Sequence, residues 1–213
     1  MTCCTPDGYR TIFGAKTVER DVRRYARKGL VGSAQWLFER LHAATVTGRS
    51  VLEIGGGIGD LQLELIQAGA SHATNIELVN TYEEAAGTLI SERGFQEQID
   101  RRIGDFGLNA DKAPTADIVV MHRVICCYPD PDTLVAAACK HSGIRVAITI
   151  PTESWWVKLG FATMNAWFRV RRIDFQAYVH PVERMTAVAA MHGFHSTDEQ
   201  RGRMWTSMIL GRV

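Results

Sequence analysis

The sequence has almost no net charge and no long apolar run. Its 213 residues contain 24 Lys and Arg against 23 Asp and Glu, so the formal net charge is +1. A nearly neutral chain lacks the basic surface on which nucleic-acid binders depend, so we expect no nucleic-acid partner. No apolar run approaches the roughly 18 residues of a membrane span, and residues 1–10 lack the apolar segment of a signal peptide. We therefore expect no transmembrane segment and a cytoplasmic location.

Cysteine is too scarce and too irregularly spaced for a secreted disulfide framework. The five cysteines form two adjacent pairs, Cys3-Cys4 and Cys126-Cys127, plus Cys139. No pair has the CxxC spacing of zinc sites, and adjacent cysteines point in different directions along a chain. The sequence therefore indicates no metal site, and a soft-metal contact that joins the two pairs is left as an open alternative.

The remaining composition is that of one globular domain over residues 1–213. Hydrophobic residues make up 46% and charged residues 22%, which excludes a disordered or fibrous chain. The charges are unevenly distributed, however. Residues 1–50 carry nine basic and four acidic side chains, whereas residues 51–100 carry one basic and nine acidic side chains. A sum near zero therefore conceals a basic and an acidic region.

Strand-like and helical patterns alternate from residue 50 onward. The strand-like runs begin at residues 50, 72, 99, 116 and 145, and helical patterns fill most of the segments between them. This alternation predicts a Rossmann-like α/β fold with a mostly parallel, doubly wound sheet. Two later strand-like runs, 194–200 and 204–213, are joined by a hairpin-length link around Gly202. We therefore predict seven strands, the last of them antiparallel.

Two helical segments lie outside this alternation. Residues 1–45 are predicted to form an N-terminal cover with helices over 17–28 and 33–43. Residues 152–190 are longer than one crossover helix requires, so we predict a helical lid inserted after strand five. Apolar side chains recur in it at helical spacing, which more often marks core than a binding surface. This stripe consists of Trp156, Phe161, Met164, Trp167 and Phe168.

Aromatic and basic side chains in these two segments bear on the kind of substrate. Aromatic residues in a lid favour a bulky or planar substrate. Arg169, Arg171 and Arg172 follow the predicted lid helix, and another basic cluster lies within residues 20–28. Most of these charges are expected to be solvated. If both segments flank the cleft, they would attract an anionic substrate or a membrane surface that holds one, so peripheral membrane contact stays open.

A glycine-rich turn is the most informative motif. Glu53 lies near the end of the first predicted strand and is followed by Gly55, Gly57 and Gly59. Glycines at such a strand-to-helix turn let the backbone approach a ligand at the carboxyl edge of the sheet. The dinucleotide fingerprint GxGxxG would need a glycine at position 60, which is Asp60, so a nicotinamide cofactor is disfavoured.

The Glu-x-Gly-x-Gly-x-Gly spacing resembles motif I of class I S-adenosylmethionine (SAM)-dependent methyltransferases. The resemblance covers nearly all of the chain after residue 50 and implies an enzyme that uses SAM. It implies that Glu77, 22 residues beyond Gly55, binds the ribose hydroxyls through charge-assisted hydrogen bonds. Asp105 and Phe106 would meet the adenine amine and ring. Taken singly, Glu77 and Asp105 could equally be solvated loop acids.

The segment from His122 to Asp130 is similar to a stretch of the magnesium-protoporphyrin O-methyltransferases. Those enzymes have a catalytic His where this chain has Cys127, and an Asp where it has Arg123. They also have a catalytic N-terminal Tyr, which Tyr25 matches best, and a Tyr-x-His motif that residues 178–180 match. Because Cys127 and Arg123 differ from the family, the resemblance does not extend to a porphyrin carboxylate as acceptor.

Candidate catalytic residues follow from the chemistry of methyl transfer. The reaction is an in-line displacement at an activated carbon, so the protein positions the acceptor and removes a proton where one is present. His180 and His122 are candidate bases, and Tyr128 or Tyr25 is a candidate to orient the nucleophile. Alternatively, His122 contributes only its backbone and ring edge to the cofactor. Cys127 is a candidate acid–base group, with inert packing as an equal alternative.

The sequence therefore predicts a methyltransferase that acts on a small organic acceptor, most simply by O-methylation. S-methylation of a thiol or metalloid through the loop of Cys126 and Cys127 is the alternative among enzymes. A non-catalytic protein that binds the cofactor and acts as a partner is the alternative from another class. The oligomeric state stays open.

Overall fold

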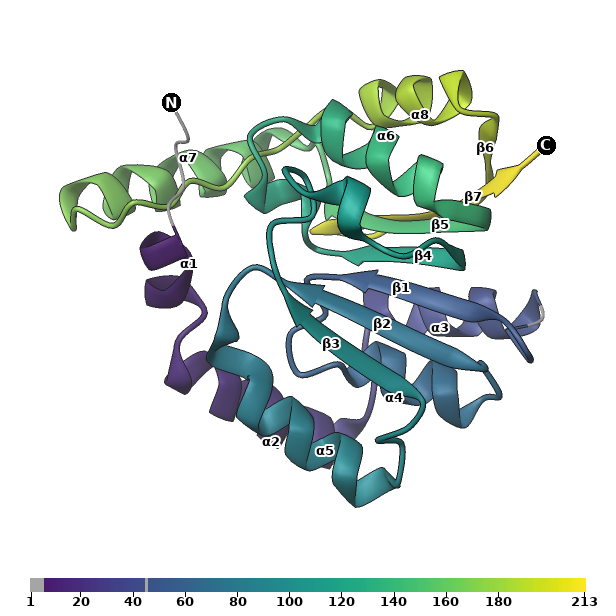
Figure 1. The fold of residues 1–213 in the computed structure, drawn as a ribbon. Helices are drawn as coiled ribbons and strands as arrows, with labels where there is room; N and C mark the ends of the chain where they lie inside the picture. The colour runs from purple at the N-terminus through teal and green to yellow at the C-terminus, as the bar shows by residue number, and fades with distance from the viewer. Residues whose placement is uncertain (1–5, 45) are drawn as a thin grey trace.

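The computed structural model describes residues 6–44 and 46–213, which surround one seven-stranded sheet (Figure 1). The strand order is β3-β2-β1-β4-β5-β7-β6. Six strands share one direction, and β7 is antiparallel to both of its neighbours, β5 and β6. This confirms the predicted sheet. The strands are β1 (Ser50–Ile54), β2 (His72–Glu77), β3 (Ile99–Ile103), β4 (Ala116–His122), β5 (Ser142–Pro151), β6 (Phe194–Arg201) and β7 (Trp205–Arg212).

Helices cover both faces of the sheet, which explains the apolar strand sequences. Helices α6 and α8 pack together on one side, and α3 and α4 lie on the other (Figure 1). Val119 and Val120, neighbours on β4, face opposite sides of the sheet, and both are fully buried. The helices are α1 (Pro6–Ile12), α2 (Ala15–Lys28), α3 (Ser33–Ala43), α4 (Asp60–Gln67), α5 (Glu83–Arg93), α6 (Pro131–His141), α7 (Trp155–Val170) and α8 (Val182–Met191).

The N-terminal cover contains one more helix than the two that we predict from the sequence. Helix α1 precedes α2, and Gly14 separates them with an extended backbone. Seven residues are too few for a stable isolated helix. Tyr9 of α1 packs edge-on against Phe175, with 5.2 Å between the ring centres. This long-range contact stabilises α1, and local periodicity does not reveal it. Cys3 and Cys4 lie outside the described residues.

The structure confirms only in part our prediction that the apolar stripe of residues 156–168 is core, because Phe161, Met164 and Phe168 belong to or pack against a buried aromatic cluster but the other two do not. Only Val157 and Phe168 of α7 are buried, whereas Trp167 is 51% exposed. Helix α7 extends beyond the sheet, with α1 beside it, so just one of its faces meets the rest of the chain (Figure 1). The segment 152–190 also contains most of α8, which packs on α6 and leads into β6 as an ordinary crossover helix.

The topology fixes where a ligand can bind. Chain order reverses between the central strands β1 and β4, which pair in parallel. At such a switch point the loops that follow the two strands diverge to opposite faces and leave a crevice at the carboxyl edge. The glycine-rich turn follows β1, and the segment beginning at His122 follows β4. The two motifs that the sequence analysis singles out therefore face each other.

Candidate active site

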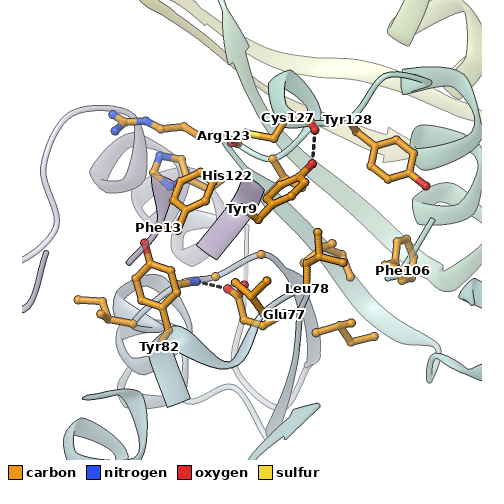
Figure 2. Close-up of a pocket in the computed structure, with 18 of the residues that line it drawn as sticks. Tyr9, Phe13, Glu77, Leu78, Tyr82, Phe106, His122, Arg123, Cys127 and Tyr128 are labelled. Carbon is orange, nitrogen blue, oxygen red and sulfur yellow. Dashed lines mark hydrogen bonds between the residues drawn. The ribbon is translucent and has the colours of Figure 1, made fainter. Parts of the chain in front are cut away.

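A cavity of about 300 Å³ lies at this edge of the sheet. Its walls come from α1 and α2, from the β1–α4 turn, and from the residues that follow β2, β3 and β4. In Figure 2, Glu77 and Tyr82 lie on one side of it, and Cys127 and Tyr128 lie on the other. Part of the predicted cofactor set and part of the predicted acceptor set thus meet in one cavity.

The glycine-rich turn is shaped so that its backbone forms the cavity floor. Gly55, Gly57 and Gly59 all have positive φ angles, of 63°, 60° and 79°. A Cβ on Gly55 would lie 2.7 Å from a methyl carbon of Val124 in the loop after β4. Side chains are therefore excluded at Gly55 both by backbone conformation and by space. Gly55 and Gly57 line the cavity, whereas Gly59, the N-cap residue that precedes α4, does not.

Glu77, the last residue of β2, places a buried carboxylate in the cavity. It accepts a hydrogen bond from the backbone N–H of Gly57, as Figure 2 shows. Burial raises the pKa of Glu77 to about 7, although the Gly57 N–H and the Arg101 guanidinium oppose the rise. Near neutral pH, Glu77 is therefore present in both its protonated and its ionised form. Ligand hydroxyls that donate to the carboxylate would favour its ionised form.

Arg101 of β3 is a supporting residue that the sequence analysis missed. Its side chain is almost completely buried, donates to the Gly57 carbonyl at 2.9 Å and forms an ion pair with Glu83 at 2.8 Å. It thereby holds the carbonyl of Gly57, whose N–H donates to Glu77. The only signal in the sequence was a charged residue inside a short predicted strand. Such residues are common on the exposed face of a strand, so the signal does not point to a site.

Glu53 supports the turn from below and does not line the cavity. It is 2% exposed, and its Oε2 atom lies 3.5 Å from Nδ2 of Asn75. A Cβ on Gly56 would lie 2.5 Å from the same oxygen, so the turn rests directly on this carboxyl group. Burial raises the pKa of Glu53 to about 8, and repulsion from Asp60 adds to the rise. The motif acid therefore acts through the glycine turn that lies above it.

Asp105 and Phe106 follow β3 and line the cavity as a polar and an apolar group. Phe106 is buried, whereas Asp105 is partly exposed and accepts from the backbone N–H of Leu108 at 3.1 Å. The Tyr128 hydroxyl donates to Asp105 Oδ1 across 3.4 Å. Burial raises the pKa of Tyr128 to about 12, and the charge of Asp105 contributes. Tyr128 therefore links the loop after β4 to the residues that follow β3.

Tyr9 and Phe13 form the N-terminal wall of the cavity, and neither was among the predicted site residues. The Tyr9 hydroxyl donates to the backbone carbonyl of Cys127 (Figure 2). The ring centres of Tyr9 and Phe13 lie 6.1 Å apart. Their aromatic character was the only local signal, and it does not indicate that residues 9 and 127 meet.

His122 and Arg123 share one serine. The Arg123 guanidinium donates to Ser33 Oγ at 3.0 Å, and the same oxygen lies 3.0 Å from His122 Nε2. Because burial lowers the pKa of His122 to about 3, with repulsion from Arg123 and Arg24 adding, its ring is neutral. The Ser33 hydroxyl and His122 Nε2 share one hydrogen bond, and the tautomer of the neutral ring sets which of them donates. His122 lines the cavity, but it takes up no proton near neutral pH.

Arg123, which lines the cavity next to His122, carries a positive charge. Its backbone has a left-handed φ of 61°, and its guanidinium lies 4.6 Å from the centre of the Trp205 ring. It forms no ion pair with any residue that the structure describes. By contrast, Arg24, which also lines the cavity, is paired with Asp60 at 3.1 Å.

The two adjacent cysteines have different surroundings. Cys126 is buried, and its thiol lies 3.3 Å from the Arg123 carbonyl. Cys127 lines the cavity, with 3.8 Å between the two sulfur atoms. Within residues 6–44 and 46–213, no three His, Cys, Asp or Glu side chains group closely enough to hold a metal ion.

The structure places Tyr25 and His180 outside the cavity. The Tyr25 hydroxyl donates to Glu64 at 2.5 Å and accepts from Arg93 at 2.9 Å, on the outer side of α4. His180 is 7% exposed, and its Nε2 donates to the Tyr128 carbonyl at 2.9 Å. Tyr25 and His180 therefore both bond to neighbouring elements of the fold, and neither of them lines the cavity. His180 still positions the backbone of Tyr128.

Comparisons with known proteins identify the fold. The sequence matches no protein-family model and no curated protein. Among solved structures, the magnesium protoporphyrin IX methyltransferase from Synechocystis PCC 6803, with bound SAH, has a TM-score of 0.75 at 17% identity. That match covers 96% of this chain and 98% of the other. The same enzyme has also been crystallised with bound SAM, with a TM-score of 0.68.

Two further matches have the same architecture. An O-methyltransferase family protein from Burkholderia thailandensis has a TM-score of 0.71 at 15% identity, over 96% of this chain and 62% of that one. An O-methyltransferase family 2 protein from Planctomyces limnophilus, in complex with apigenin, has a TM-score of 0.63 at 15% identity, over 93% and 62%. The chain therefore has the Rossmann-like methyltransferase fold, as predicted. At these identities the likeness establishes the fold, and activity must be argued from the site.

Proposed function

We propose that this protein is a SAM-dependent methyltransferase that methylates an oxygen atom of a small organic acceptor. One observation carries the proposal. The glycine-rich turn, the Glu77 carboxylate and the pair Asp105-Phe106 end three successive parallel strands and line the same cavity. The neighbouring methyltransferase fold with bound SAM and SAH supports this choice of cofactor.

The residues present fit such a cofactor. Gly55 and Gly57 leave open backbone where a side chain would intrude, and Glu77 offers a carboxylate to the ribose hydroxyls. Phe106 supplies an apolar ring and Asp105 a hydrogen-bond acceptor for an adenine amine. When bound, SAM supplies a methyl group on a positively charged sulfur. The chain's own task is then to orient the acceptor and to exclude water.

The groups near Tyr9 favour an acceptor whose oxygen is already ionised. His122 has a pKa of about 3 and Tyr128 a pKa of about 12, so neither accepts a proton near neutral pH. A carboxylate acceptor needs no such base. The unpaired charge of Arg123 favours an anionic acceptor as well, and Tyr9 and Phe13 favour one with an apolar or planar body.

S-methylation of a thiol or metalloid is the second candidate, because Cys127 lines the cavity. It predicts that Cys127→Ser abolishes turnover and leaves cofactor affinity intact. O-methylation predicts that this variant retains turnover. Residence in the cytoplasm stays a prediction.

Two measurements test the proposal. Calorimetry should detect binding of SAM and not of NAD. Product mass spectrometry after incubation with SAM and fractionated metabolites should then reveal a gain of one methyl group together with SAH. Binding of NAD alone would overturn the cofactor assignment. Binding of SAM without SAH formation from any fraction would instead favour the non-catalytic partner protein.

A further inference from the structure

Helix α7 has two apolar faces, and only one of them is covered. Its inner face carries the buried Val157 and Phe168. Its outer face carries a second apolar stripe at spacings of three and four residues. The members of this outer stripe are Trp155, Leu159, Ala162, Ala166 and Val170, all of them exposed. Trp155 is 76% exposed, Leu159 56% and Val170 80%. Exposed aromatic and aliphatic side chains in one continuous row mark a surface for association.

The charges around the outer stripe are mostly positive, although Glu153 forms an ion pair with Lys158 at 3.9 Å. Lys158 and Arg169 flank it on the helix, and Arg171 and Arg172 follow its last turn. All four are exposed, and residues 154–173 contain no Asp or Glu. Trp167, which is half exposed, lies under the Arg171 guanidinium at 5.6 Å. An apolar stripe bordered by cations and tryptophan is complementary to an apolar layer bordered by anions.

We infer that the outer face of α7 docks on the surface of an anionic lipid bilayer, with the helix in the plane of the headgroups. The apolar stripe would enter the boundary between headgroups and acyl chains, where tryptophan is favoured. The four cations would contact lipid phosphates. Among the residues that the structure describes, no helix combines the length and hydrophobicity needed to cross a bilayer. An orientation along the surface is therefore the geometry that suits α7.

The charge pattern disfavours a second copy of this chain as the occupant. Two α7 helices packed through their outer stripes would bring Lys158 and Arg169 of both copies together. Glu153 pairs with Lys158, but Arg169, Arg171 and Arg172 form no ion pair with any residue that the structure describes, so their repulsion would go uncompensated. The bilayer supplies the opposite charge along its whole surface, so it satisfies the apolar stripe and the cations at once.

The inner face of α7 connects this surface to the acceptor end of the cavity. Phe168 packs against Phe175 with 5.6 Å between ring centres, and Phe175 packs against both Tyr9 and Phe13, at 5.2 and 5.9 Å. One aromatic layer thus separates the docking face from the cavity wall. If the proposed methylation holds, an amphiphilic acceptor could pass from the bilayer to the cavity. The docking itself does not depend on that reaction.

Sedimentation with lipid vesicles tests the inference. We expect the protein to sediment with vesicles of phosphatidylcholine mixed with phosphatidylglycerol and to stay in the supernatant with phosphatidylcholine alone. Replacing both Leu159 and Val170 with Glu should abolish binding, because it places two anions in the stripe. Replacing Arg169 and Arg172 with Gln should weaken it by about fivefold per residue. Added salt should weaken it further.

Met191→Glu is the matched control. Met191 is also 76% exposed, but it lies on α8, outside the outer stripe. This variant should bind like the wild type, and all variants should keep the wild-type circular dichroism spectrum, since the altered side chains are exposed. Equal binding to both kinds of vesicle, or unchanged binding of the Leu159/Val170 variant, would overturn the inference. So would a dimer in solution that only the Leu159/Val170 variant dissociates, because the stripe would then be occupied by a second copy. SAM affinity, measured separately, shows whether a failure belongs to docking or to the proposed reaction.

Discussion

The two ends of the cavity are built in different ways. At the end proposed for the cofactor, each contribution comes at or directly after the end of a parallel strand: the turn after β1, Glu77 at the end of β2, and Asp105-Phe106 after β3. At the end proposed for the acceptor, Tyr9 comes from an N-terminal helix and bonds to Cys127, 118 residues away. The sheet itself assembles the first end, whereas long-range packing assembles the second. Substitutions at the two ends should therefore separate cofactor binding from acceptor turnover.

Protonation separates the two ends as well. Burial raises the pKa values of Glu53 and Glu77 to about 8 and about 7, so the cofactor end changes charge near neutral pH. Burial lowers the pKa of His122 to about 3, so the acceptor end keeps a constant charge there. A change of pH around 7 should thus alter the affinity for the cofactor more than the turnover of the acceptor.

The largest effect should come from Gly55→Ala. The new methyl group meets Val124 and requires a left-handed backbone, so the turn must move away from the ligand. We expect SAM affinity, measured by calorimetry, to fall by about 100-fold.

Gly94→Ala is the matched control for the backbone cost. Gly94 ends α5 with a φ of 73°, but a Cβ there meets nothing within 4 Å. It should lower the free energy of unfolding by roughly 1–2 kcal/mol and leave SAM affinity unchanged. Equal losses of affinity in the two variants would mean that stability, and not the site, limits binding.

Glu77→Gln should have the next largest effect. The neutral amide cannot accept charge-assisted hydrogen bonds, so we expect a loss of SAM affinity of about 10- to 100-fold. The wild-type affinity should rise as pH increases through 7, because the ionised carboxylate is the form that binds hydroxyls. In the variant this rise should disappear. Calorimetry from pH 6 to 8 measures both effects.

Glu84→Gln removes the same charge from an exposed position on α5. It should retain both the wild-type affinity and its pH dependence. A Glu77→Gln protein that keeps the wild-type pH dependence would remove Glu77 from the cofactor site.

Most of the fold could be predicted because its signals are local. Apolar runs such as residues 116–122 and 145–151 indicate buried parallel strands, and the link around Gly202 indicates the final hairpin. The predictions failed where tertiary contacts decide the outcome. Helix α1 depends on Tyr9 meeting Phe175, and the exposure of α7 depends on where the sheet ends. The periodicity of apolar residues in the sequence reveals neither the formation of α1 nor the exposure of α7.

The candidate site divides along the same line. Of the predicted cofactor residues, Gly55, Gly57, Glu77, Asp105, Phe106 and His122 line the cavity, because spacing after a strand fixes position. Of the predicted catalytic residues, Cys127 and Tyr128 line it, whereas Tyr25 and His180 do not. A Tyr on a cover helix can be assigned to the cavity only when the packing of that helix is known, which explains why Tyr9 was missed.

Tyr9→Phe should lower acceptor turnover without lowering cofactor affinity, and its effect should be smaller than that of Glu77→Gln. It removes the donor to the Cys127 carbonyl and leaves the ring in place, so the loop after β4 loses one fixed point. We expect kcat/KM for the acceptor to fall by about 10-fold with unchanged SAM affinity. Steady-state kinetics and calorimetry measure the two quantities.

Tyr25→Phe is the comparison variant. It removes a hydroxyl that bonds Glu64 and Arg93, which remain 3.3 Å apart as an ion pair. The free energy of unfolding should fall by about 1 kcal/mol, with acceptor kinetics intact. If Tyr25→Phe loses turnover and Tyr9→Phe does not, the N-terminal tyrosine of the resemblance is Tyr25 after all.

The smallest effect concerns His180, which lies behind the acceptor end. His180→Asn removes the N–H donor to the Tyr128 carbonyl, so we expect a loss of about 1 kcal/mol in the free energy of unfolding at pH 8, with SAM affinity unchanged. Burial lowers the pKa of His180 below its ordinary value near 6.5, so the unfolded chain binds this proton more readily than the folded protein. Its stabilisation is therefore complete above pH 6.5 and decreases as pH falls below that value. The difference between wild type and variant should shrink from pH 8 to pH 5 in urea unfolding, whereas the exposed His195→Asn should show no difference at either pH. A loss of turnover that exceeds the loss of stability, with a pH profile to match, would instead move His180 from positioning Tyr128 to the reaction itself.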